Sequence, residues 1–465
     1  MTEDDHVKAL ILAAGQGNRL GRLTKLKPKG LLRVAGTPLL GRILRGLKKA
    51  GVQEIWIVVG YMADMIREQI GENYAQLNIQ FIEAKHWKKG NLYSLLAAQG
   101  IFQQDFLLCM CDHIFDQQIP EALINNESEK ALVLAIERVA EEDTKVLERK
   151  GKIFDIGKKI NQSNVAIDTG FFLCSPRIFE YAKEAAREGA VELADCVRVA
   201  ARNDDTQVVD VSGHLWADID TKQDLSRAKR LLAEHSQKKR GASDFVAYYI
   251  NRPMENAILY HISDWLFITP NRLTIATNII AWFVTYLFFS GNLALASILT
   301  FVVGVLDGLD GKLARIRGQE TKLGRMEHPF DMLYEFSWLI ALAMFLGRTQ
   351  GLLPLELCLF SLTFIAFYRF CYDQFSRTMK VSLDIYGQFE RAFRRIAGRR
   401  NIYNIYIFFG VLFDLPLLSL YAITFHSALT AVVYAWRASV HMHASDIKSR
   451  RENSSEILSA RASRI

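Results

Sequence analysis

Two kinds of hydrophobic pattern divide the chain near residue 241. Before that point, apolar stretches are short and interrupted by Lys, Glu and Asp. From about residue 273 to residue 436, apolar runs repeat and reach the roughly 17 to 25 residues that a helix needs to cross a bilayer. The pattern predicts a water-soluble half followed by a membrane half, in a chain of 465 residues that is too long for one ordinary domain.

The first half alternates strand-like apolar runs with helical patterns. The runs cover residues 9–13, 54–59, 106–111 and 131–135, and a helical pattern covers residues 39–50. Such alternation predicts a parallel or mostly parallel sheet with helices on its faces. We therefore expect an α/β Rossmann-like domain over residues 1–235.

The second half predicts an all-α, six-helix transmembrane domain over residues 268–445. The six expected spans are residues 272–289, 293–316, 324–346, 352–375, 402–413 with some preceding turns, and 417–441. Residues 236–267 read as a basic linker and a helix lying along the membrane interface, because aromatic and aliphatic residues mix there with Arg252 and Glu255. Residues 446–465 read as a mobile tail.

Basic residues predict the orientation in the membrane. Lys and Arg gather after the second span, after the fourth span and in the tail, whereas the opposite loops hold almost none beyond Arg348. The positive-inside rule then makes this a multi-pass protein of the cytoplasmic membrane with both termini cytosolic, and the N-terminus lacks the pattern of a signal peptide. Because these loops supply the net charge of +7, we expect the lipid bilayer and no nucleic acid as a partner. The six scattered cysteines read as reduced packing residues.

The segment LILAAGQGNRLGRLTKLKPKGLLRVAGTPLL, residues 10–40, carries the first candidate site. The predicted strand runs into Ala14, Gly15 and Gly17, where glycines let backbone N–H groups approach a phosphate closely. Arg19 and Lys29 then supply cations for a triphosphate. This ordered string resembles the signature of the sugar nucleotidyltransferases.

Later motifs extend that resemblance. It implies that Asn91, in the loop Trp-Lys-Lys-Gly-Asn, positions base and substrate, and that Asp112 binds one Mg²⁺ or Mn²⁺ together with Asp218 or Asp220. Such an ion would neutralise repulsion between the two reacting phosphates. The alternative is that these carboxylates cap helices or face solvent. The KPKGL, Cys-Asp-His and Asp-Ile-Asp-Thr strings resemble the branch that uses CTP to make CDP-inositol, CDP-choline or CDP-aminoethylphosphonate-like products. Lys158 either binds the substrate phosphate or is an exposed turn lysine.

The second candidate site lies at the end of the second expected span. Asp307 and Asp310 are three residues apart and share one helix face. Carboxylates at membrane depth are costly unless they pair or bind metal, so they indicate function. Gly311 leaves the helix thin enough for a nucleotide to approach, and Arg315 can meet its phosphates.

This string resembles the CDP-alcohol phosphotransferase family. The resemblance implies a nucleotide site at Asp310, Gly311 and Arg315, two Mg²⁺ or Mn²⁺ ions held by carboxylates, and a last Asp that deprotonates the acceptor hydroxyl. The chain departs from the pattern where His328 and Met332 occupy the two later Asp positions.

Glu327 and Asp331, each one residue before those positions, keep the expected spacing of four residues. We predict metal ligation by Asp307, Asp310, Glu327 and Asp331, with Asp331 also the base. Three alternatives remain. The pair Asp331 and Glu335 could replace the last two Asp of the family pattern, His328 could be the base, or the domain could be inactive. The basic stretch 391–400 either binds an acceptor phosphate or only sets topology.

Together the two resemblances imply a bifunctional enzyme. It would use CTP and a small phosphoalcohol to make a CDP-alcohol, then pass the phosphoalcohol unit to an acceptor hydroxyl and release CMP. The fusion resembles enzymes that make di-inositol phosphates, a lipid acceptor is also compatible, and the resemblance implies a homodimer. The first alternative is a phosphotransferase with a non-catalytic regulatory domain, and the second is a transporter whose acidic residues form an ion path.

Overall fold

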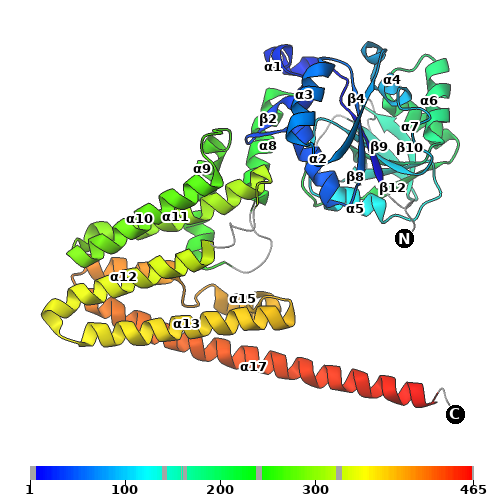
Figure 1. Ribbon diagram of the computed structural model, residues 1–465. Coiled ribbons are helices and arrows are strands. Elements are labelled where there is room, and N and C mark those ends of the chain that lie inside the picture. Colours follow the sequence, from blue (N-terminus) through cyan, green and yellow to red (C-terminus); the bar gives the residue numbers. More distant parts are fainter. Residues whose placement is uncertain are drawn as a thin grey trace. The chain divides into compact units, whose positions relative to one another are not determined.

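A computed structural model gives the fold of residues 7–138, 144–158, 160, 165–236, 243–320 and 327–462. The side chains of Glu327 and of residues 451–462 lie outside this description. The chain divides into two compact units, Met1–His235 and Ser236–Ile465, and each is described by itself (Figure 1). Residues 237–242, within the predicted basic linker of the segment 236–267, lie outside the described residues.

The first unit is built on a mixed sheet of nine strands in the order β10-β9-β11-β6-β1-β4-β5, with β8 joining β11 to β12. Two further pairs, β13-β7 and β2-β3, lie apart from it. The strands are β1 (Lys8–Leu12), β2 (Arg33–Val34), β3 (Thr37–Pro38), β4 (Glu54–Val59), β5 (Asn78–Glu83), β6 (Phe106–Met110), β7 (His113–Phe115), β8 (Leu132–Glu137), β9 (Lys145–Arg149), β10 (Lys152–Gly157), β11 (Ala166–Cys174), β12 (Thr206–Asp210) and β13 (Trp216–Asp218).

The predicted parallel sheet is right for one half only. Strand β1 pairs in parallel with β4 and β6, β4 with β5, and β12 with β8. Strand β11 pairs antiparallel with β6, β8 and β9. The prediction of a mostly parallel sheet is therefore wrong around β11, because β9 and β10 form an antiparallel hairpin there instead of a crossover helix.

Helices cover both faces of this sheet. Apolar residues of α2, α3 and α5 pack on one face, and those of α4, α6 and α7 pack on the other. The helices are α1 (Arg22–Leu26), α2 (Leu39–Lys49), α3 (Ala63–Asn73), α4 (Asn91–Leu96), α5 (Gln118–Ile124), α6 (Ile178–Arg187), α7 (Leu193–Arg202) and α8 (Lys222–His235). The parallel strands β1 and β6 end side by side, so the loops that follow Leu12 and Met110 open at the same edge.

The second unit is helical. A short π-helical turn, Ala247–Asn251, leads into α9. The helices are α9 (Arg252–Ile262), α10 (Pro270–Ser290), α11 (Leu293–Arg317), α12 (Glu327–Gln350), α13 (Leu353–Met379), α14 (Leu383–Tyr386), α15 (Gln388–Arg394), α16 (Arg400–Leu412) and α17 (Pro416–Ala462). Helix α17 continues past residue 446, where the tail was expected to begin.

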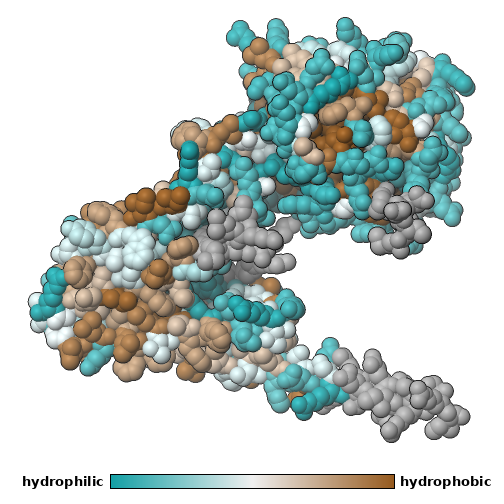
Figure 2. All heavy atoms as spheres, viewed as in Figure 1, coloured by the Kyte–Doolittle hydropathy of each residue, from teal (hydrophilic) through white to brown (hydrophobic). Residues whose placement is uncertain are grey.

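Five helices of the described chain are long and apolar enough to cross a membrane: Pro270–Ser290, Leu293–Arg317, His328–Gln350, Leu353–Met379 and Pro416–Arg450. The predicted count of six is not confirmed, because α16 has 13 residues. Large apolar side chains on the outside, such as Ile279 and Phe283 of α10, are exposed, and the space-filling view shows apolar surface over these helices (Figure 2). The unit is that of a membrane protein.

Asp205 joins the end of α7 to the sheet. Its carboxylate accepts a hydrogen bond from the backbone N–H of Ala131 at 3.0 Å and another from the Tyr181 hydroxyl at 2.9 Å, and it pairs with Arg177 at 2.9 Å. We expect Asp205→Ala to cost about 2 kcal/mol, because buried donors lose their acceptor. Thermal unfolding of the full chain in detergent should show a midpoint lower by roughly 4–8 °C. Asp64→Ala, at a side chain that is 99% exposed, is the control and should leave the midpoint unchanged.

Candidate active sites

Two cavities of the first unit meet at Asp112. One, of about 390 Å³, lies along the loop Ala14 to Asn18 and contains Lys29. The other, of about 450 Å³, is lined by Lys158, Asp168 and Trp216 among others. Gly90, Asn91, Met110 and Asp112 line both cavities. A molecule in each cavity would therefore meet its neighbour beside the Asp112 carboxylate.

The glycine-rich loop has the conformation that its sequence predicts. Gly17 has φ of 66°, a left-handed value that favours glycine. A Cβ on Gly17 would lie 3.1 Å from the Lys29 side chain, so the glycine also leaves room for this lysine. Ala14 and Gly15 line the same cavity. Asn91 opens α4, and its Oδ1 accepts the backbone N–H of Leu193 at 2.7 Å, which fixes the amide between the two cavities.

Lys29 is the buried cation of this site. Its Nζ lies 2.6 Å from Asp112 Oδ2 and 2.6 Å from Asp220 Oδ1, and Arg19 also pairs with Asp220. Burial alone would lower the pKa of Lys29, but Asp112, Asp218 and Asp220 together raise it. Burial alone would raise the pKa of Asp112 and Asp220, but Lys29 lowers both. Lys29, Asp112 and Asp220 are therefore charged at neutral pH.

A possible metal site lies beside this cation. Asp112, His113 and Asp218 each offer a ligand atom, and these atoms lie within 4.8 Å of one another, which makes them the one such trio in the described part of the chain. His113 Nε2 lies 3.7 Å from Asp112 Oδ1 and 3.5 Å from Asp218 Oδ1. Asp112 Oδ1 is buried and accepts no hydrogen bond from the described residues. A divalent cation fits this donor set. Burial raises the pKa of Asp218 to about 6.

His113 is a candidate ligand that the sequence pattern did not indicate. Its position is set by Gly170, which has φ of +70°. A Cβ on Gly170 would lie 2.1 Å from His113 Cε1, so only glycine leaves space for the imidazole. Trp216 donates its indole N–H to the Thr169 carbonyl at 2.8 Å, which connects β13 to the part of β11 that contains Gly170. Lys158, for which two roles were open, lines the second cavity.

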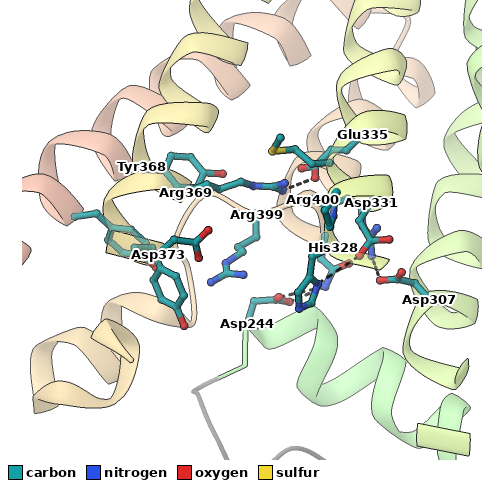
Figure 3. Close-up of a pocket in the computed structure, with 15 residues that line it drawn as sticks. Asp244, Asp307, His328, Asp331, Glu335, Tyr368, Arg369, Asp373, Arg399 and Arg400 are labelled. Atoms are coloured by element: carbon teal, nitrogen blue, oxygen red, sulfur yellow. Dashed lines mark hydrogen bonds and ion pairs between the residues drawn. The ribbon is translucent and has the colours of Figure 1, made fainter. Parts of the chain in front are cut away.

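A third cavity, of about 500 Å³, lies in the membrane unit (Figure 3). Asp307 of α11, Asp331 of α12 and Arg400 of α16 face it. Arg400 pairs with Asp307 and also donates to the Tyr334 hydroxyl. That hydroxyl lies 3.4 Å from Asp307 and 3.2 Å from Asp331, so it joins the two carboxylates.

The other residues predicted for this site are placed as follows. His328 Nδ1 lies 3.8 Å from Asp331, on a side chain that is 74% exposed. Asp310 accepts a hydrogen bond from Thr274 and is not among the described residues that line the cavity. Gly311 follows it, and Arg315 donates to the Ser236 carbonyl. The Glu327 side chain lies outside the described residues.

Three arginines line the cavity: Arg369, Arg399 and Arg400. The last two belong to the basic stretch 391–400, for which either phosphate binding or a role in topology was expected. Arg369 pairs with Glu335, and Arg400 pairs with Asp307. Arg399 lies with its guanidinium 5.5 Å from the Tyr372 ring and pairs with no carboxylate among the described residues. The cavity therefore holds two carboxylates bound by arginine and one cation available to an anion.

Comparisons with known proteins agree with both halves. The family model described as "MobA-like NTP transferase domain" matches residues 9–239. The model described as "CDP-alcohol phosphatidyltransferase" matches residues 267–431.

Two similar proteins match over most of the chain. A "Bifunctional IPC transferase and DIPP synthase" of Aquifex aeolicus is 33% identical over 349 residues, which are 74% of this chain and 79% of that protein. The protein of the same description from Thermococcus kodakarensis is 32% identical over 354 residues, covering 72% and 75%. Among solved structures, the inositol-1-phosphate CTP transferase from T. maritima is 27% identical, with a TM-score of 0.43, over 49% of this chain and 94% of that one.

The charge balance around Lys29 gives a testable expectation. Lys29→Met leaves three neighbouring carboxylates without their buried cation, so we expect a loss of about 3 kcal/mol in the free energy of unfolding. Millimolar Mg²⁺ should restore part of it, because an added cation replaces the lost charge. Thermal unfolding with and without Mg²⁺ measures both effects. Lys48→Met, at an exposed residue of α2, is the matched control. Equal stability of the two variants would contradict this charge balance.

Proposed function

Since the chain belongs to the family of bifunctional IPC transferases and DIPP synthases, we propose that the alcohol it activates is inositol 1-phosphate. The protein is a bifunctional enzyme that activates a phosphorylated alcohol with CTP and transfers the phosphoalcohol unit to an acceptor hydroxyl with release of CMP. The observation that supports the first step best is the pair of cavities that meet at Asp112.

In the first step, the cavity along Ala14, Gly15 and Gly17 holds CTP, and the cavity with Lys158 and Asp168 holds the phosphoalcohol. A phosphate oxygen of the alcohol attacks the α-phosphorus of CTP, and the bond to pyrophosphate breaks. Lys29 and Arg19 stabilise the negative charge of the departing pyrophosphate. Asn91, which borders both cavities, positions the two reactants.

We assign the cation of this step to Asp112 with Asp218 or Asp220, and we add His113 to the candidate ligands. When bound, Mg²⁺ or Mn²⁺ would screen the repulsion between the two phosphate groups. Asp220 is held by Lys29 and Arg19, whereas Asp112 keeps one oxygen without a partner among the described residues, so Asp112 is the principal ligand in this proposal.

In the second step, the membrane cavity holds the diphosphate of the CDP-alcohol near Asp307. Asp331 takes the proton from the acceptor hydroxyl, whose oxygen attacks the β-phosphorus, and the bond to CMP breaks. Tyr334, joined to Asp307 and Asp331, keeps the base beside the reacting phosphate. Two ions held by Asp307, Asp310, Glu327 and Asp331 would suit this chemistry. Asp310, Gly311 and Arg315 are proposed to contact the nucleotide.

The acceptor is a second phosphorylated polyol in this proposal. Arg399 provides a cation inside the cavity that pairs with no described carboxylate, which suits the acceptor phosphate. A diacylglycerol acceptor has no anion to place there.

We also propose the domain limits 1–235, 236–267 and 268–445. Helix α16, with the turns before it, is a sixth span. Both termini are cytosolic, as the distribution of Lys and Arg indicates. The enzyme is proposed to work as a homodimer.

Separate variants should separate the two reactions. With CTP and inositol 1-phosphate, Asp112→Asn should reduce pyrophosphate release at least a hundredfold but leave CMP release from added CDP-inositol unchanged. Asp307→Asn should do the reverse. Asp64→Asn, at an exposed side chain that lines none of the three cavities, is the control. Should the wild-type protein release no pyrophosphate with any phosphoalcohol, the first unit would be a regulatory module instead.

The base assignment has its own test. Asp331→Asn should lower CMP release from CDP-inositol by about 10²- to 10⁴-fold, the usual contribution of a general base. His328→Ala should lower it less than about fivefold, because the imidazole is mostly exposed and lies beside the base. A larger loss in His328→Ala than in Asp331→Asn would transfer the role to His328.

A further inference from the structure

The membrane cavity contains two buried polar atoms that the proposed reaction does not use. Glu335 is 4% exposed and Tyr434 is 5% exposed, and both line the cavity. Glu335 Oε1 and the Tyr434 hydroxyl have no hydrogen-bonding partner among the described residues. Unpaired polar atoms at membrane depth are costly, so the cavity is built for a ligand that pairs with them.

The hydrogen-bonding capacity of these two atoms indicates which ligand groups can pair with them. Arg369 donates to the other Glu335 oxygen, and as a carboxylate Glu335 presents Oε1 to the cavity as a hydrogen-bond acceptor. It therefore needs a donor such as a hydroxyl, and its negative charge repels phosphate. The Tyr434 hydroxyl can donate or accept. Hydroxyl groups fit both atoms, while a hydrocarbon chain would leave both unpaired.

The position of Glu335 relates it to the proposed base. Glu335 follows Asp331 by one turn of α12, and residues four apart share a helix face with Cβ atoms about 5–6 Å apart. Both residues line the cavity. Figure 3 shows Glu335 extending toward Arg369 and Asp331 lying toward Asp307, with the Arg399 guanidinium pointing away from Glu335. A polyol in this cavity can therefore meet Glu335 as well as Asp331.

We propose that Glu335 and Tyr434 are specificity-determining residues that bind ring hydroxyls of the acceptor other than the attacking one. The inference rests on the proposed function, in which Asp331 is the base and the acceptor is a phosphorylated polyol. Arg399 then binds the phosphate end of the acceptor, and the Glu335 end selects for hydroxyls. Arg369 is a positioning residue that directs Glu335 Oε1 into the cavity.

The test measures acceptor kinetics of the full chain with preformed CDP-inositol and no CTP. In Glu335→Gln, Arg369 should hold the amide oxygen, so the NH₂ group faces the cavity and can no longer accept. We expect KM for inositol 1-phosphate to rise about tenfold in Glu335→Gln and about fivefold in Tyr434→Phe. KM for CDP-inositol and pyrophosphate release from CTP should stay within twofold of wild type. Glu356→Gln, an exposed glutamate of α13, is the control.

Cyclohexyl phosphate, which keeps the ring and the phosphate but has no hydroxyl, distinguishes recognition from structure. Its inhibition constant against inositol 1-phosphate should not rise in either variant. An equal rise for this inhibitor would show a structural role, and an unchanged acceptor KM in both variants would also overturn the inference. Tyr434→Phe removes one oxygen only, so it decides the matter if Glu335→Gln folds poorly. A wild-type enzyme that makes CDP-inositol but transfers to no polyol phosphate would refute the proposed function instead.

Discussion

The sites depend on one physical constraint: several carboxylates must lie close together in surroundings where unpaired charge is costly. In the first unit, Lys29 lies between Asp112 and Asp220. In the membrane unit, Arg400 binds Asp307 and Arg369 binds Glu335. Asp112, Asp220, Asp307 and Glu335 therefore each have a cation from the protein itself. These carboxylates are therefore already neutralised by lysine and arginine before any ligand binds. A metal ion or a phosphate that binds later exchanges partners with these ion pairs.

Small residues make this balance possible, because charged side chains need space beside the backbone. Gly17 leaves room for Lys29, and Gly170 leaves room for His113. In the membrane unit, a Cβ on Gly308 would lie 2.3 Å from Glu255 Oε1, and Glu255 in turn pairs with Lys312 at 2.8 Å. Helix α9 is thereby fixed against the part of α11 that carries Asp307 and Asp310. Gly308, between those two aspartates, therefore has a packing role.

Local patterns predicted the elements well, and contacts between distant elements account for what they missed. Strand β4 was expected over residues 54–59 and runs over Glu54–Val59, because its apolar run is short and clearly bounded. The antiparallel course of β11 was missed, since pairing direction depends on a hairpin at β9 and β10 whose own signal is weak. His113 was missed for a similar reason: its neighbour Gly170 is 57 residues later in the sequence. Helix α16, with 13 residues, falls below the length of an ordinary span.

The family pattern has aspartates where this chain has His328 and Met332, so it must be asked whether another carboxylate faces the membrane cavity in their place. A shift of one residue turns a helix face by about 100°, which would carry an aspartate away from its partner if α12 kept the orientation expected from the family pattern. Yet the Tyr334 hydroxyl lies 3.4 Å from Asp307 and 3.2 Å from Asp331. One phenol cannot reach both carboxylates unless they face the same space. The orientation of α12 therefore accommodates the shifted sequence, and Asp331 occupies the cavity wall beside Asp307. This favours an active transferase over a domain that has lost its chemistry, because a degenerate site would have no reason to keep a partly buried carboxylate there at the cost of desolvation.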